Sequence, residues 1–95
     1  MTDENDFASE MDKKIEQWDA EITKFRIIAE VAHLNDQIEQ YQVIEDIVTK
    51  EKAVIEKLAA FNESGIVDRN DLKNKIVDLQ KIVEDTIEAA RVKIN

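Results

Sequence analysis

The sequence predicts an all-helical fold, because it contains few residues that break helices and its apolar side chains recur at helical spacing. The chain has 95 residues with one Gly and no Pro, so few positions favour the turns that a sheet would require. Charged residues make up 37% and aromatic residues 5%, a balance typical of long solvated helices. We therefore expect a long, coiled-coil-like helical hairpin that self-associates into a bundle.

The N-terminal half carries an uninterrupted apolar seam. Its members alternate in steps of four and three residues, as in a coiled coil, and are Met11, Ile15, Trp18, Ile22, Phe25, Ala29 and Ala32. A second series overlaps the end of this seam and consists of Ile27, Val31, Leu34, Ile38 and Tyr41. Because the overlap makes the helix apolar on nearly every side, the helix must be enclosed there or change its contact face.

A turn is predicted at residues 63–68, around the only Gly of the chain. Gly65 suits the left-handed position that follows many helices, and Asp68 is a favourable N-cap for the next helix. Val67 and Leu72 then occupy the two positions of a hydrophobic staple. We expect an acidic tail at residues 1–8 and one helical domain at 9–95, with helices over 9–62 and 69–93.

Whether residues 9–62 form one helix depends on the segment 33–36, where Asn35 and Asp36 could start a new helix. No Gly or Pro assists a break there, and breaks have identifiable causes, so we expect a continuous helix of about 80 Å. The last helix, about 38 Å long, would leave the seam from Met11 to Phe25 in water unless a partner covers it. The alternative is a monomeric three-helix bundle that breaks near His33.

The charge distribution narrows the choice of partners. The formal net charge is −9; residues 1–67 carry 16 acidic and 7 basic groups, whereas residues 68–95 carry six of each. Between Ile27 and Thr49 there are five acids and no Lys or Arg. Such a surface repels nucleic-acid phosphates and anionic lipids, so we expect neither a nucleic-acid nor a membrane partner. No signal peptide is evident, and we expect a cytoplasmic location.

No pattern of residues indicates catalysis or a metal site. The chain has no Cys, which removes thiolate ligands and cysteine nucleophiles. Glu30 and His33 have the Glu-x-x-His spacing of di-iron bundles, but the second motif and the further carboxylates of such a site are missing. We expect no cofactor, no metal and no enzyme activity, and a carboxylate-bridged metal protein is a further alternative.

The segment Trp18-Asp19-Ala20-Glu21-Ile22 resembles a family of short bacterial coiled-coil proteins of uncharacterised function. These proteins are similar to apolipoproteins in the profile of their amphipathic helices. Tyr41, Ser64-Gly65 and Asp71-Leu72-Lys73 match the family as well, so the resemblance spans residues 11–95. It implies a helical architecture, but it implies no known activity and no site residues.

The function expected from these features is that of a non-catalytic structural or interaction protein, a small bacterial coiled-coil oligomer with a stress-related role among the options. The expected interaction seam consists of Met11, Ile15, Trp18, Ile22, Phe25 and Tyr41. Packing in the core is the simpler interpretation of Trp18 and Tyr41, and a hot spot for binding a partner is the more specific alternative. The partner is a second copy of the chain or, for an adaptor, a different helical protein.

Overall fold

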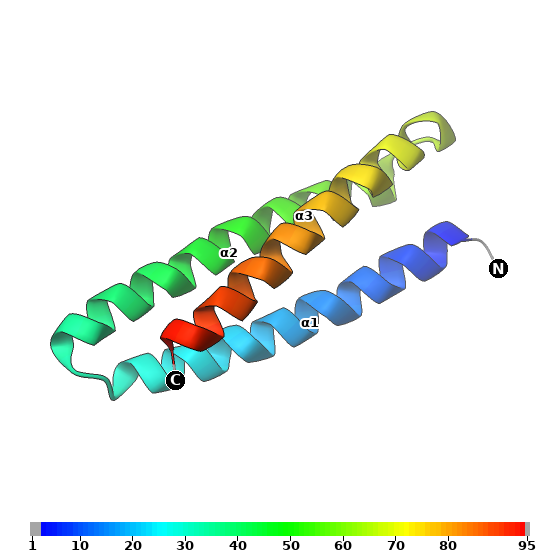
Figure 1. Cartoon of the computed structure of the whole chain (residues 1–95). Helices are drawn as coiled ribbons and strands as arrows, with labels where there is room; N and C mark the ends of the chain where they lie inside the picture. Colours follow the sequence, from blue (N-terminus) through cyan, green and yellow to red (C-terminus); the bar gives the residue numbers. More distant parts are fainter. Residues whose placement is uncertain (1–2, 95) are drawn as a thin grey trace.

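The computed structural model describes residues 3–94 and is a bundle of three helices in which successive helices run antiparallel (Figure 1). The helices are α1 (Asp3–Glu30), α2 (Leu34–Glu63) and α3 (Ile66–Lys93), and no strand occurs within residues 3–94. The prediction of an all-helical fold is therefore confirmed. The bundle is elongated, measuring 50 × 19 × 18 Å, and α2 packs against both of the other helices.

The prediction of one continuous helix over residues 9–62 is wrong, because the chain turns back at residues 31–33. His33 is extended, with φ −62° and ψ 151°, and α2 begins at Leu34. Asp36 lies in the first turn of α2, where its negative charge interacts favourably with the helix dipole. The fold is thus the three-helix bundle with a break near His33 that was the alternative prediction.

Gln37 stabilises this break. Its side-chain amide donates to the carbonyl oxygen of Ala29 at 3.0 Å and to that of Glu30 at 3.4 Å. These carbonyls belong to the last turn of α1, and the Ala29 carbonyl also accepts from the backbone N–H of Ala32 at 3.2 Å, just beyond the helix. The contact forms only after the chain has turned back, so no local capping pattern in the sequence announces it.

Burial of the α1 seam explains why the chain breaks. Met11, Trp18 and Phe25 expose only 1%, 4% and 3% of their surface, and Ile22 is buried as well. Burying a large apolar side chain contributes about 1.5–3 kcal/mol, whereas a backbone hydrogen bond contributes about 0.5–1.5 kcal/mol net. Several buried side chains therefore outweigh the few helical hydrogen bonds that are lost at residues 31–33.

The turn between α2 and α3 is shorter than predicted and is built differently. It consists of Ser64 and Gly65, and Gly65 has φ −78°, so the expected left-handed glycine is wrong. Gly65 is the N-cap of α3, and Asp68, the expected cap, lies within the first helical turn. Ser64 ends α2 by donating from its hydroxyl to the Phe61 carbonyl oxygen at 2.9 Å.

The acidic tail predicted at residues 1–8 is helical over residues 3–8, which form the first turns of α1, while residues 1–2 lie outside the described residues. The Phe7 ring packs edge-on against Phe61 of α2, with 5.2 Å between ring centroids. The Lys73 ammonium of α3 lies 5.3 Å from the centroid of the Phe7 ring. These contacts, which a seam starting at Met11 did not anticipate, attach the start of α1 to both other helices.

Because the α1 seam is buried within one chain, Trp18→Ala should lower the free energy of unfolding by about 3–5 kcal/mol, as for large aromatic side chains in cores. The urea midpoint of the unmodified protein should not change between micromolar and near-millimolar concentrations. If Trp18→Ala does not fold, Trp18→Phe supplies a milder loss. A midpoint that rises with protein concentration would show that the seam is intermolecular.

Gly65→Ser should raise the free energy of unfolding by about 0.5–1 kcal/mol, because Ser is a good N-cap and restricts the unfolded chain. A Cβ at this position meets no atom within 4 Å. Thermal unfolding measures the effect, and Gly65→Ala, which provides no capping oxygen, is the control. A destabilised Gly65→Ser variant would contradict the observed cap geometry.

Candidate functional site

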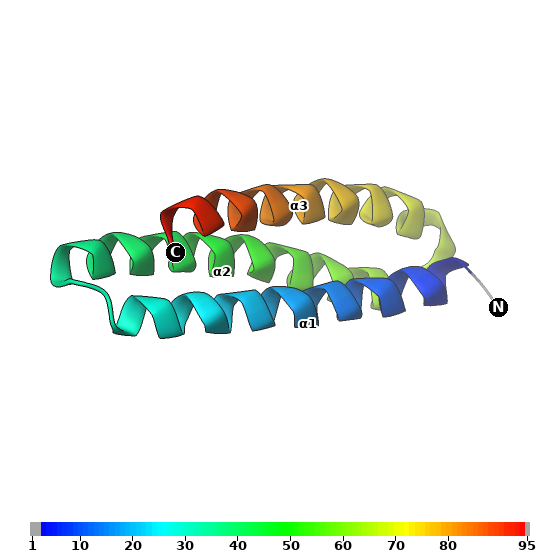
Figure 2. The ribbon, with the colours of Figure 1, turned by 60° about the horizontal axis from the view of Figure 1, so that its bottom comes forward.

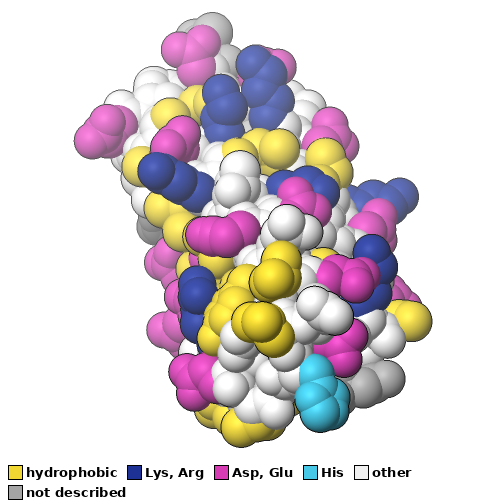
Figure 3. All heavy atoms as spheres, turned by 90° about the vertical axis from the view of Figure 1, so that its left-hand side faces the viewer, with side chains coloured by type: hydrophobic (Ala, Val, Ile, Leu, Met, Phe, Trp, Pro, Cys, Tyr) yellow, Lys and Arg dark blue, Asp and Glu magenta, His cyan; other side chains and the backbone are white. Residues whose placement is uncertain are grey.

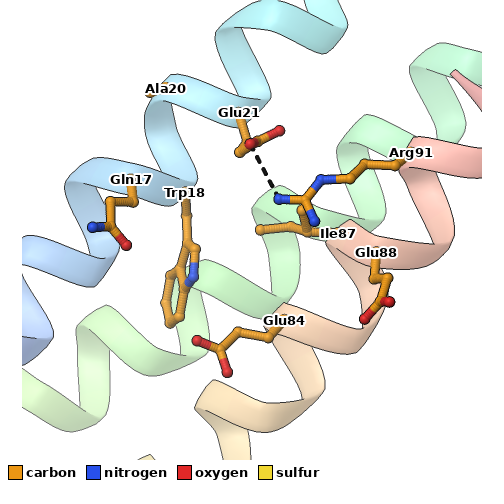
Figure 4. A pocket seen from close by; sticks show the side chains of 8 residues that line it. All are labelled: Gln17, Trp18, Ala20, Glu21, Glu84, Ile87, Glu88 and Arg91. Atoms are coloured by element: carbon orange, nitrogen blue, oxygen red, sulfur yellow. Dashed lines mark hydrogen bonds and ion pairs between the residues drawn. The ribbon is translucent and has the colours of Figure 1, made fainter. Parts of the chain in front are cut away.

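Side chains of α1 and α3 line an open cavity of about 500 Å³ (Figure 4). Its lining consists of Gln17, Trp18, Ala20, Glu21, Glu84, Ile87, Glu88 and Arg91. The Arg91 guanidinium reaches across it and pairs with Glu21 at 3.1 Å. Trp18 and Ile87 are buried core residues. Of the three carboxylates in the lining, Glu21 pairs with Arg91 and Glu84 pairs with Lys14 at 3.7 Å.

Two threonine hydroxyls bond to the backbone of their own helices. The hydroxyls of Thr23 and Thr86 donate to the carbonyl oxygens of Asp19 and Ile82 in their own helices. Glu30 ends α1 and His33 lies between the helices, so they do not share a helix face as Glu-x-x-His ligands must. No group of three potential ligands is placed to hold a metal ion within the described part of the chain.

Glu51 of α2 is the one buried charged residue among those whose burial the structure describes, with 6% of its surface exposed. The pKa of its carboxyl is raised from 4.5 to about 7, mainly by burial and in addition by hydrogen bonding to Asp19 of α1 and by the negative charge of Asp19. Its Oε2 atom has no hydrogen-bond partner among the described residues. The α1–α2 interface therefore contains a carboxyl that keeps its proton close to neutral pH.

This raised pKa makes stability depend on pH. The folded protein binds the Glu51 proton more tightly than the unfolded chain does. The stabilisation that comes from this proton is therefore complete below about pH 4.5 and is lost as the pH rises through 7. Over that range Glu51 should cost up to about 3 kcal/mol of stability. Glu51→Gln should remove this component, whereas Glu56→Gln, an exposed control on the same helix, should retain it.

Urea unfolding of both variants and of the unmodified protein at pH 5 and pH 8 measures the difference. The Glu51→Gln protein should be the most stable of the three at pH 8. An identical pH dependence in all three proteins would show that Glu51 is ionised in the folded state.

Four exposed large apolar side chains lie near the α1–α2 connection, at one end of the bundle. We call these four residues the tip patch; their exposed fractions are Ile27 (58%), Val31 (85%), Leu34 (70%) and Ile38 (54%). Figure 2 shows that α3 stops short of this end, so that α1 and α2 project beyond it. Figure 3 views this end and shows hydrophobic side chains gathered among acidic ones.

Exposed acidic side chains lie in and just after the segment that carries the tip patch. They are Glu30, Asp36, Glu39 and Glu45, and none of them takes part in an ion pair among the described residues. Asp46, the next acid along α2, is paired with Lys50 at 3.0 Å. Lys93, at the end of α3, is the basic residue that lines the adjoining depression together with Ile38 and Glu39.

The residues expected to form an interaction seam are brought together, but inside the chain's own core. Met11, Trp18, Ile22 and Phe25 are buried there, and Ile15 and Tyr41 are partly buried against them. The seam is therefore covered within one chain, and no partner is needed to bury it. The tip patch consists of the second apolar series without Tyr41. The sequence therefore contains these residues as a pattern, but the pattern by itself indicates two overlapping helix faces and not an exposed surface.

No family model matches the chain, and no match was found among curated proteins or solved structures. Within residues 3–94, no helix combines the length and the apolar character needed to cross a membrane.

Proposed function

We propose that this chain is a non-catalytic interaction protein that binds another protein through its tip patch. The observation that carries the proposal is the exposure of four large aliphatic side chains, 54–85% each, at one end of a bundle whose core is already complete. Exposed apolar side chains that are concentrated at one end of a small protein can mark a protein-binding surface.

The fold itself does not account for these apolar residues. The α1 seam is buried without them, and α3 ends at Lys93, too early to cover them. Polar residues at the four positions would keep the helices and the core intact. A binding role accounts for apolar side chains where folding does not require them.

A homo-oligomer in the cytoplasm is the second candidate, because a two-fold axis through the tip would bury the same patch in both copies. In that case the two copies meet at the tip patch and not at the α1 seam. The absence of enzyme activity is part of both candidates and is supported by the ion pairs that engage Glu21 and Glu84 in the cavity beside Trp18.

Photo-crosslinking tests the proposal in living cells. A photoreactive benzoylphenylalanine placed at Val31 should capture another protein, whereas the same group at Ile82, a 45% exposed position on α3, should capture little. Mass spectrometry identifies the adducts, and an adduct with a second copy would favour the homo-oligomer. Equal capture at the two positions, or none at Val31, would refute a docking role for the tip.

A further inference from the structure

Helix α1 packs more extensively against α2 than against α3. Two depressions, of about 500 and 510 Å³, are lined only by residues of α1 and α3, and Figure 4 shows one of them. The ion pairs Lys14–Glu84 at 3.7 Å and Glu21–Arg91 at 3.1 Å link the two helices, and their side chains are 26–56% exposed. Ion pairs that water can reach contribute little to stability, so these links hold α1 only weakly against α3.

The charges of the helices also oppose the docking of α1. Helix α1 carries nine acidic and four basic residues and α2 carries seven and three, whereas α3 carries six of each. The net charges of the three helices are therefore −5, −4 and 0. Helices α1 and α2 repel each other as like charges, while the pairing of α2 with α3 meets no such repulsion.

A buried carboxyl lies where α1 meets α2. Glu51 belongs to the core series of α2, whose members alternate in steps of three and four residues and are Ile44, Ile47, Glu51, Val54, Leu58 and Phe61. Glu51 faces Asp19 of α1, and its Oε2 atom has no hydrogen-bond partner among the described residues. An unpaired carboxylate is costly to bury, and this cost disappears when α1 moves away and water reaches the group.

No basic side chain forms an ion pair with Glu51 among the residues that the structure describes. Lys50, its neighbour on α2, pairs with Asp46 and donates to the Thr86 hydroxyl of α3. Lys14 of α1 is paired with Glu84 of α3. The cations near this level of the bundle are therefore engaged elsewhere, and the negative charge of Asp19 is the one that Glu51 meets from α1.

The connection at residues 31–33 is suited to act as a hinge. The backbone N–H groups of Val31 and Ala32 bond to carbonyls in the last turn of α1, so these two residues can move with α1. The Gln37 side chain joins the end of α1 to α2, but its hydrogen bonds lie at the hinge itself and need not break when α1 swings out. A few residues at the ends of helices are enough to absorb such a rotation.

We infer that α1 opens away from the α2–α3 hairpin as one unit, hinged at residues 31–33, and that the contact between Asp19 and Glu51 sets how readily it opens. The opened form exposes the seam of Met11, Trp18 and Phe25 together with the apolar faces of α2 and α3 that the seam covers. This inference goes beyond the proposed function, because the tip patch takes no part in it.

Native-state hydrogen exchange of the full chain tests the opening. Backbone amides of Trp18, Ile22 and Phe25 should share one protection factor, at least about tenfold lower than those of Ile47 and Val83 in the cores of α2 and α3. Low concentrations of urea should change the α1 values less, because opening exposes less surface than global unfolding does. Equal protection and equal urea dependence in all three helices would overturn the inference.

The Gly65→Ser variant distinguishes opening from global unfolding. It stabilises the α2–α3 turn, which stays formed when α1 opens, so it should raise the protection factors of α2 and α3 about two- to fivefold and leave those of α1 unchanged. A parallel rise in all three helices would show that α1 exchanges only when the whole chain unfolds.

The Asp19→Asn variant tests the carboxyl contact at pH 8, above the pKa of about 7 of Glu51. Removing the charge that faces Glu51 should raise the α1 protection factors about three- to tenfold. Asp12→Asn, which removes an exposed charge elsewhere on α1, is the matched control and should raise them less than twofold. Equal effects of the two variants would refute the role assigned to Asp19 and Glu51.

Discussion

The burial of the apolar seam of α1 against α2 and α3 is the interaction on which the rest of the structure depends. Trp18 and Phe25 fill the space between the helices, and an uninterrupted helix would have left them in water. This gain is large enough to break a segment that contains no Gly or Pro. The side-chain amide of Gln37 then donates to the Ala29 carbonyl at the end of α1, which the backbone N–H of Ala32 also reaches.

The same constraint creates the exposed tip. To bury its seam, α1 must run alongside α2 for nearly its whole length, which places the connection at residues 31–33. The third helix begins at the opposite end and reaches only Lys93, so it cannot cover the region around that connection (Figure 2). The same packing of the three helices therefore buries the seam and leaves the tip patch exposed.

The helical class, the seam and the position of the second turn could be predicted because they depend on local spacing. The break at residues 31–33 could not, since the contact of Gln37 with Ala29 exists only in the folded chain. The left-handed conformation predicted for Gly65 rested on its residue type and on the cap and staple pattern around it, whereas an extended N-cap satisfies the same turn. For the candidate site, the apolar series from Ile27 to Ile38 was visible in the sequence, but its exposure depends on where α3 ends.

The charged residues fall into two groups, those that form ion pairs between helices and those that lie on the surface near the tip patch. The balanced charges of α3 are used within the chain, where Arg91 pairs with Glu21 and Glu84 pairs with Lys14 to link α1 to α3. The acids around the tip patch have no such role among the described residues, and their mutual repulsion opposes the compact state. Of these acids, Asp36 stabilises the start of α2 through the helix dipole, whereas Glu30, Glu39 and Glu45 have no ion pair among the described residues.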